Sequence, residues 1–448
     1  MPETRSTTED APEPSQAGTK ASKSTLAELP REIWVLISGG FIVAIGMGIV
    51  SPALPTFATS FNVGVTAAAF IVSAFALMRL VFAPASGKLV SLFGERPNYV
   101  LGIVIVGISS TACAFAQSYW QLLVFRGLGG IGSTMFTVSA LALLVRLAPA
   151  HLRARASGLW ATSFLLGSIS GPVLGGLLIG FSLRLPFLIY GVALYIAAFV
   201  GWFLLRNSTL ADPQQQAAAP DLKVTTALRD PSYRASLLAN FSKGWTAQGV
   251  RIALIPLFIV EAMGLSDAMT GVALSVFAAG NAAVLIPAGR LADSRGRKPM
   301  LLSGLAIAAV GSAAIGFSDS VPWLLGASLL GGIGMGLFTP AQSAAVADIV
   351  GPKAKGGPVL ATFQMSADVG TILGPPLAGA LAEELSYGPA FLLTGCVAVV
   401  ALLMWLFSPE TLGRGSRAER SEPAGSAESA GSTESAGSTG PAERGAAD

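Results

Sequence analysis

Long apolar stretches recur along almost the whole chain, and they restrict its possible folds more than any other feature. Most of them reach the roughly 20 residues that an α-helix needs to cross the hydrocarbon core of a bilayer. Strands of a β-barrel would instead appear as segments of about ten residues with alternating polarity. The sequence therefore predicts an all-α polytopic membrane protein with twelve transmembrane helices. The expected spans are residues 34–57, 66–88, 99–117, 120–146, 155–180, 185–206, 233–260, 267–289, 299–317, 321–349, 357–382 and 387–407.

The composition excludes most other classes of protein. Of the 448 residues, 52% are hydrophobic and only 12% are charged, whereas soluble domains are about 25% charged. One histidine and two cysteines cannot provide a multi-histidine metal site or a disulfide framework. A net charge of +3 argues against nucleic-acid binding. Neither a nucleophile–base pair nor a phosphate loop of the type G-x-x-x-x-G-K-S/T is found, so we expect no enzyme activity, no metal and no cofactor.

Polar segments divide the chain into five parts. Two of these are tails that contain too few apolar residues to form a core, and we expect them to be disordered. The parts are an N-terminal tail (1–32), a six-helix bundle (33–206), a linker (207–232), a second six-helix bundle (233–408) and a C-terminal tail (409–448).

The two bundles repeat each other at an offset of about 202 residues. The sequence GKLVSLFGER at 87–96 corresponds to GRLADSRGRK at 289–298. In the same way, GSISGPVLGG at 167–176 corresponds to GTILGPPLAG at 370–379. Two parallel repeats of six helices are the architecture of a transporter whose halves rock about a central site.

The loops predict the orientation in the membrane. Nearly all Lys and Arg outside the spans lie in the tails, the linker and the loops on the same side, and the other side has only Arg184. Because positive loops stay inside, we expect a cell-membrane protein with both termini in the cytoplasm. Its expected partners are the lipid bilayer, a small-molecule substrate and protons, without nucleic acid, and we expect a monomer.

Four motifs resemble those of the major facilitator superfamily, in the expected spans and order. They are GMGIVSPALPTFA (46–58), RGLGGIG (126–132), GSISGPVLGG (167–176) and GRLADSRGRK (289–298). Within that superfamily the chain resembles the twelve-span drug:proton antiporters. The resemblance implies the major facilitator fold and secondary active transport by alternating access.

The resemblance also implies two sets of residues that control conformation. They are Gly87, Gly94, Arg96, Gly289, Asp293, Gly296 and Arg297 in the loop motif, and Gly167, Gly171, Pro172, Gly175 and Gly176 in span five. By the repeat, Asp293 should approach the start of span five near residues 155–158 and hold one state; Ser91 replaces this Asp in the first copy. Tight helix packing and an ordinary positive loop are the alternatives for these motifs.

Five charged residues fall inside the expected spans, namely Arg79, Arg126, Lys243, Arg251 and Asp368. Each costs about 2.5–3.5 kcal/mol in a bilayer, so they should pair or face a wet central cavity. Asp368 is the only deep carboxylate and therefore the candidate proton site, with Arg126 as its candidate partner. Snorkelling cations, and a structural bond between helices for Asp368, are the alternatives.

A substrate cavity is expected between the two bundles. Its predicted lining is Arg79, Lys243, Arg251, Asn240, Trp245, Gln248, Asn281, Gln342 and Gln364. Four buried cations against one carboxylate favour a neutral, amphiphilic or anionic substrate. The predicted function is proton-coupled efflux of small organic molecules, as multidrug or metabolite export. The alternative is a facilitator or importer of a metabolite such as an organic anion or a sugar.

Overall fold

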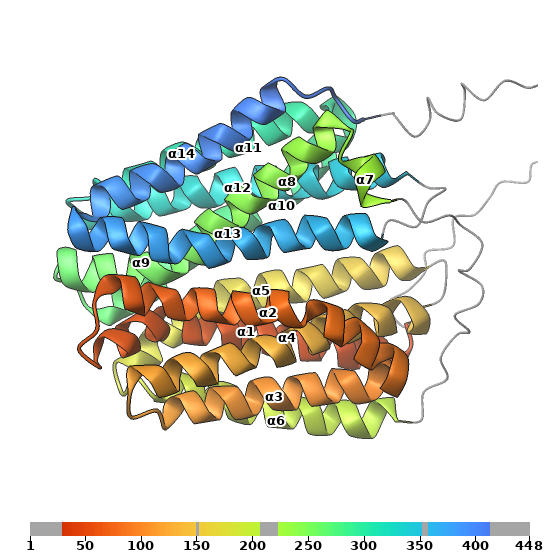
Figure 1. Ribbon diagram of the computed structural model, residues 1–448, viewed down its shortest axis with the longest axis horizontal. Coiled ribbons are helices and arrows are strands. Elements are labelled where there is room, and N and C mark those ends of the chain that lie inside the picture. The colour runs from red at the N-terminus through yellow and green to blue at the C-terminus, as the bar shows by residue number, and fades with distance from the viewer. Residues whose placement is uncertain (1–28, 149–151, 207–222, 352–356, 413–448) are drawn as a thin grey trace, which may run out of the picture.

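The computed structural model describes residues 29–148, 152–206, 223–351 and 357–412, which form helices joined by short turns, with no strand among them (Figure 1). The first half contains α1 (Arg31–Thr59), α2 (Val65–Phe93), α3 (Glu95–Ala114), α4 (Tyr119–Leu147), α5 (Arg153–Ile179) and α6 (Leu185–Leu205). The second half contains α7 (Val224–Ala227), α8 (Pro231–Lys243), η4 (Gly244–Val250), α9 (Arg251–Leu257), η5 (Phe258–Ala262), α10 (Asp267–Arg295), α11 (Arg297–Ile315), α12 (Val321–Val350), α13 (Gly357–Glu384) and α14 (Tyr387–Leu406).

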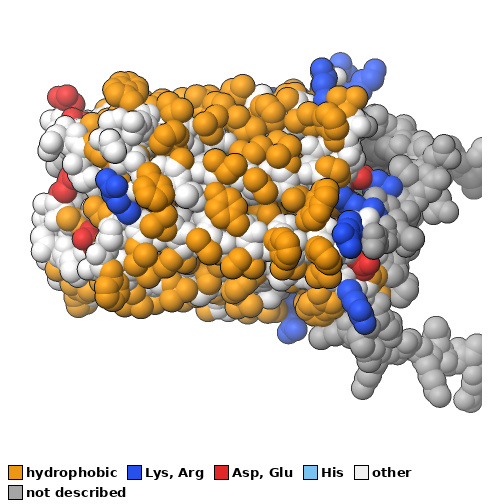
Figure 2. Space-filling model, turned by 90° about the horizontal axis from the view of Figure 1, so that it is seen from below, with side chains coloured by type: hydrophobic (Ala, Val, Ile, Leu, Met, Phe, Trp, Pro, Cys, Tyr) orange, Lys and Arg blue, Asp and Glu red, His pale blue; other side chains and the backbone are white. Residues whose placement is uncertain are grey.

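Eleven helical stretches among the described residues are long and apolar enough to cross a membrane. One of them, Pro231–Ala262, joins α8, η4, α9 and η5 and corresponds to the expected seventh span. The remaining long helix, α13, has 28 residues and contains polar side chains, Asp368 among them. Apolar side chains cover the flank of the molecule between its two polar ends (Figure 2). The prediction of an all-helical polytopic membrane protein is confirmed.

The two halves pack their helices in the same order. α3 packs on α4 and α6, and α11 packs in the same way on α12 and α14. The halves, which lie side by side in Figure 1, meet where α2 packs on α13 and where α5 packs on α10. Since α2 corresponds to α10 and α5 to α13 in the sequence repeat, these two contacts are the same contact related by a pseudo-twofold axis.

Two glycines at equivalent positions of the repeat turn the chain between helices. Gly94 separates α2 from α3 with φ +82°, and Gly296 separates α10 from α11 with φ +113°. Residues with a Cβ rarely adopt a positive φ, because the Cβ then collides with the backbone. Glycine has no Cβ and therefore allows these sharp turns. The two loop motifs therefore share a glycine with positive φ at the turn between their helices.

The boundaries of the five parts differ slightly from those expected. α1 already begins at Arg31, and α8 at Pro231. Residues 409–412, which the sequence assigned to the disordered tail, are described, and Glu410 accepts hydrogen bonds from the first N–H groups of α11. A carboxylate at a helix N-terminus is stabilised by the unpaired N–H groups there, and this interaction holds residues 409–412 against the start of α11. The expected disorder of the two tails concerns residues 1–28 and 413–448, which lie outside those described, as does most of the expected linker, at 207–222.

Candidate functional site

A cavity of about 370 Å³ lies between the two halves. Helices α1, α2, α4 and α5 line it from one half, and η4, α9, α10 and α13 line it from the other. The structure brings six of the predicted site residues together in its wall: Arg79, Arg126, Arg251, Gln248, Asn281 and Asp368. A site shared by both halves is one that a rocking motion can expose to either side of a membrane.

Asp368 forms an ion pair across the two halves. Its carboxylate Oδ1 lies 3.5 Å from Nη2 of Arg79, and their side chains are 12% and 25% exposed, respectively. The sequence had pointed to Arg126 as the partner, and the structure brings Arg79 to this position instead. The reason is helix packing, because α13 packs directly on α2, whereas α4, which carries Arg126, packs mainly on α2 and α3.

Two aromatic rings support the other cavity arginines. The guanidinium of Arg126 lies over the ring of Phe75 at 4.3 Å, and that of Arg251 lies over Phe277 at 3.5 Å. A cation over an aromatic face gains electrostatic attraction without an acidic partner. Sequence reasoning did not find Phe75 and Phe277. A signal existed, because the two are separated by the repeat offset and lie at equivalent positions in α2 and α10.

Asn240 and Gln342, which were expected in the cavity, bind helices together instead. Asn240 donates from Nδ2 to the carbonyl of Phe363 at 2.6 Å, which holds α8 to α13. Gln342 donates from Nε2 to the carbonyl of Ser236 at 3.0 Å, which holds α12 to α8. Both residues are almost fully buried within the second half.

The other three predicted lining residues also lie outside the cavity. Trp245 is buried and packs against Gly374 of α13. Gln364 is exposed on the same helix. Lys243 is the last residue of α8 and has no ion-pair partner among the described residues. Some polar residues inside the spans therefore line the cavity, and others bind neighbouring helices. The presence of a polar residue in a span does not by itself show which of these two roles it has.

The seventh span changes its helical pitch beside the cavity. It passes from α8 into the π-helical η4, then into α9 and the π-helical η5. Gly244 at the start of η4 packs directly on the backbone of α13 at Ala367. The π-helical turns leave the regular hydrogen-bond pattern, and such turns are frequent at functional sites. Gln248 in η4 and Arg251 at the start of α9 both line the cavity.

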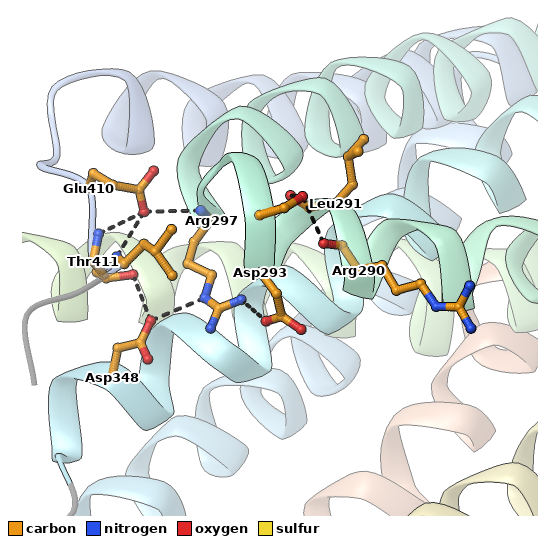
Figure 3. Close-up of polar contacts among 9 residues, drawn as sticks. Arg290, Leu291, Asp293, Arg297, Asp348, Glu410 and Thr411 are labelled. Atoms are coloured by element: carbon orange, nitrogen blue, oxygen red, sulfur yellow. Dashed lines mark hydrogen bonds and ion pairs between the residues drawn. The ribbon is translucent and has the colours of Figure 1, made fainter.

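Arg297 of the second loop motif is the centre of a polar cluster (Figure 3). Its Nη1 donates to Asp293, and its Nε donates to Oδ2 of Asp348 at 3.1 Å. Its backbone N–H and that of Lys298 donate to Glu410, both at 3.0 Å. The cluster thus ties the turn at the start of α11 to the ends of α10 and α12 and to the segment that follows α14.

This cluster corrects the predicted contact of Asp293 with span five. The Asp293 side chain is 69% exposed, and its partner is Arg297, four residues later in the same half. No described contact joins it to α5, where the position beside Gly158 is open. The guanidinium of Arg297 lies within reach of the carboxylate, whereas the close contact of α5 with α10 lies at Gly176 and Gly271, near the other end of α10.

The first loop motif contains the equivalent pair with the charges reversed. Arg146 at the end of α4 donates from Nη1 to Oε1 of Glu95 at the start of α3, at 2.5 Å. At the repeat offset, Glu95 corresponds to Arg297 and Arg146 to Asp348. Arg96, the neighbour of Glu95, donates from Nη1 to the carbonyl of Arg206 at 3.3 Å. Each half therefore has an ion pair between these two helices at equivalent positions, with the acidic and basic residues exchanged.

The other loop-motif glycines lie in open surroundings. Gly87 in α2 has nothing within 4 Å of the position that a Cβ would take. At Gly289 in α10 the nearest atom is Cβ of Pro340, at 3.8 Å. Neither glycine is needed for close packing in this conformation.

Comparison with known proteins decides the family. The sequence pattern of the Major Facilitator Superfamily matches residues 36–250 and again residues 236–438. The chain belongs to this superfamily. It is therefore a multi-pass secondary transporter of small molecules, and the prediction that it is not an enzyme is confirmed.

Several relatives of this MFS transporter carry the names of drug-resistance proteins. Multidrug resistance protein 2 of Bacillus subtilis is 24% identical over 392 residues, covering 85% of this chain and 96% of the relative. Multidrug resistance protein Stp of Mycobacterium tuberculosis is 25% identical over 401 residues, covering 77% of this chain and 74% of Stp. Quinolone resistance protein NorA of Staphylococcus aureus is 28% identical over 170 residues, covering 38% and 44% of the two chains.

Solved structures share the fold at lower identity. A D-xylose–proton symporter matches with a TM-score of 0.69 at 18% identity, covering 85% of this chain and 98% of the symporter. A transporter of the POT family in complex with a thioalcohol-conjugated peptide matches with a TM-score of 0.70 at 15% identity, covering 84% and 96%. These similarities confirm the major facilitator fold of the transporter.

The glycines of span five give the transporter close helix contacts. Gly167, Gly171 and Gly175 face α1, and a Cβ on Gly171 would lie 2.6 Å from Cα of Gly48. Gly176 faces the other half, where a Cβ on Gly271 of α10 would lie 2.9 Å from its Cα. Pro172, in the same turn, lines the cavity. Small residues let helix backbones approach closely within a membrane, so these contacts have the form of helix packing.

Polar and glycine contacts join the two halves of the transporter at the end opposite the start of α1 and the end of α14. Oε2 of Glu383, at the end of α13, accepts from the backbone N–H of Thr66 at 3.0 Å. About two helical turns further along α2, the hydroxyl of Ser73 donates to the carbonyl of Thr371 at 3.3 Å. Together with the contact between Gly176 and Gly271, these interactions hold the halves together on that side of the cavity.

Proposed function

We propose that this MFS transporter exports small organic molecules in exchange for protons, by alternating access of its two halves to the cavity. The observation that carries the proposal is the ion pair of Arg79 and Asp368, which joins α2 of one half to α13 of the other in the cavity wall. The names of the relatives from Bacillus, Mycobacterium and Staphylococcus support drugs as cargo.

The ion pair links protonation to the relative position of the halves. While Asp368 is ionised, its attraction to Arg79 favours the arrangement in which α2 lies against α13. A bound proton neutralises the carboxylate and removes that attraction, which is strong at low dielectric. Proton binding and separation of the halves then favour each other, because a ligand that binds one state better shifts the population toward it.

The direction of transport follows from the closed end and the charge distribution. The halves touch at the end where α2 and α10 begin, so we infer that substrate reaches the cavity from the other end, where α1 begins and α14 ends. Lys and Arg side chains gather at that end (Figure 2). By the positive-inside rule it is the cytoplasmic end, so substrate enters from the cytoplasm and leaves outside the cell. One chain supplies the whole cavity, and we propose that it works as a monomer in the cell membrane.

Inside-out vesicles with an imposed pH gradient test this function. We expect uptake of fluoroquinolone or dye substrates only when the lumen is acidic, together with alkalinisation of the lumen when substrate is added. A membrane potential of 100 mV provides about 2.3 kcal/mol per charge, and the pH gradient adds to it. Equilibration of substrate without dependence on pH would instead identify a facilitator.

A further inference from the structure

The cavity holds more positive than negative charge. Three guanidinium groups, of Arg79, Arg126 and Arg251, line it together with the single carboxylate of Asp368. Asp368 pairs with Arg79, and among the described residues neither Arg126 nor Arg251 has an acidic partner. Two uncompensated cations at this depth are costly unless something of opposite charge joins them.

The two uncompensated arginines are also short of hydrogen-bond acceptors. Nε of Arg126 and Nε of Arg251 are both buried without a partner among the described residues. Within the described part of the chain, their guanidinium groups make one hydrogen bond, from Nη2 of Arg251 to the carbonyl of Ala247, at 3.1 Å. A guanidinium has five N–H donors in a planar fork that fits a carboxylate, so most of this donor capacity is unused.

The repeat places these arginines on both sides of the cavity. Arg126 comes from the first half and lies over Phe75, whereas Arg251 comes from the second half and lies over the equivalent Phe277. Apolar side chains, among them Met47, form much of the remaining wall. A volume of about 370 Å³ is within the range of pockets that hold small organic ligands.

We propose that the cavity binds amphiphilic organic anions, with a carboxylate or sulfonate held between Arg126 and Arg251 and an aromatic or aliphatic body against the apolar wall. This inference rests on the proposed export function and names its substrate class. An anion offsets the positive charge and accepts from the idle donors. It also links the halves, because it binds one arginine of each. A cation would meet two positive groups, and the carboxylate that could attract it is already paired with Arg79.

Equilibrium binding of three matched probes to the full-length protein in nanodiscs tests the proposal. Naphthoate, naphthamide and naphthylmethylammonium share one ring system and differ in charge, and naphthalenesulfonate serves as a second anion. We expect naphthoate to bind about tenfold or more tightly than naphthamide, with the cation weakest, because hydrogen bonds to charged groups carry that much affinity. Equal or tighter binding of the amide or the cation would overturn the proposal.

Arg251→Gln and Arg126→Gln should lose about tenfold in affinity for naphthoate and little for naphthamide. Arg251→Lys, which retains the charge, should recover part of the loss. Arg206→Gln is the matched control, because Arg206 lies over Phe203 at the same 4.3 Å as Arg126 over Phe75, but at the end of α6 and away from the cavity lining. Unchanged naphthoate affinity in both cavity variants, with naphthamide binding intact, would contradict the assignment.

This experiment separates the substrate class from the transport function. Binding is measured without a gradient, so anion preference can hold even where transport is not proton-coupled. Conversely, proton-driven export of cationic or neutral compounds in vesicles, together with no anion preference in nanodiscs, would retain the export function and reject the anion site.

Discussion

Nη2 of Arg79 lies 3.5 Å from Oδ1 of Asp368, and among the described side chains this pair has no charged counterpart at the pseudo-symmetric interface. At the repeat offset Arg79 corresponds to Asn281, and the helix equivalent to α13 is α5, which meets α10 through Gly176 and Gly271. Both interfaces contain a close glycine contact, that of Gly379 with Thr66 and that of Gly176 with Gly271, and the interface of α2 with α13 has the ion pair in addition. In the proposed mechanism, a proton on Asp368 therefore weakens the contact of α2 with α13 and leaves the contact of α5 with α10 unchanged.

Asp368→Asn should remove proton-driven transport while leaving passive equilibration of substrate. We expect concentrative uptake into inside-out vesicles to fall by about tenfold or more, because an interaction with a charged group carries about 1.5–3 kcal/mol. Asp319→Asn, in an exposed loop between α11 and α12, is the control. Full proton-driven uptake by Asp368→Asn would remove this carboxylate from the coupling mechanism.

Gly271→Val should prevent the halves from closing at the end where α2 and α10 begin. A Cβ added at this position would lie 2.9 Å from Cα of Gly176, and valine adds two methyl groups beyond it. We expect transport to fall to background and cysteine probes at that end to become accessible from outside the cell. Gly326→Val in α12, where nothing lies within 4 Å, should behave as wild type. Normal transport by Gly271→Val would mean that this contact does not close in the cycle.

Arg297→Ala should destabilise the transporter in detergent, because Arg297 joins Asp293 and Asp348 in one cluster. Its side chain is only 10% exposed, so we expect a loss of roughly 1–3 kcal/mol, with a carboxylate left unpaired. Arg290→Ala is the matched control, since Arg290 lies in α10, three residues before Asp293, and its side chain points away from the cluster (Figure 3). Chemical unfolding would show the difference; equal stability of both variants would assign the cluster no net contribution.

Glu410 should make the stability of the transporter depend on acid. Burial alone would raise the pKa of Glu410, but hydrogen bonds from the backbone N–H groups of Leu412, Lys298, Arg297 and Thr411 outweigh it and lower the pKa below its ordinary value. A lowered pKa in the folded state stabilises the protein above the unfolded-state pKa of about 4.3, and this contribution disappears as the pH falls through the folded-state pKa.

Glu410→Gln should therefore unfold at a lower temperature than wild type at neutral pH, and the difference should shrink as the pH drops below about 5. Thermal unfolding of the detergent-solubilised protein over this range measures it. Glu384→Gln, at the exposed far end of α13, is the control. A difference between Glu410→Gln and wild type that stays constant down to pH 3 would show that the carboxylate charge has no role in capping α11.

The backbone architecture could be predicted because its causes are local. A run of apolar residues long enough for a bilayer must form a helix that satisfies its own hydrogen bonds. The repeat then related the two halves, and the deep charges pointed to a central cavity that includes Arg79, Arg126 and Asp368. Local pattern did not reveal the π-helical turns of η4 and η5, since the irregular pitch accompanies the packing of Gly244 on Ala367 of another helix.

The side-chain partners could not be predicted in the same way. Asn240 and Asp368 are both polar residues inside apolar spans, yet one binds a carbonyl of a neighbouring helix and the other pairs across the cavity. Which role a residue takes depends on the helix that faces it. That helix is distant in the sequence, and periodicity within a single span carries no information about it.

The sequence by itself determined the membrane class, the two repeated bundles and the presence of one carboxylate among several buried cations, because hydropathy, loop charge and internal similarity are properties of the chain alone. Only the tertiary structure decided that Arg79 is the partner of Asp368 and that Arg126 and Arg251 rest on Phe75 and Phe277. The physical reason is that an ion pair needs its two groups within a few ångströms, and the packing of α2 on α13 sets that distance.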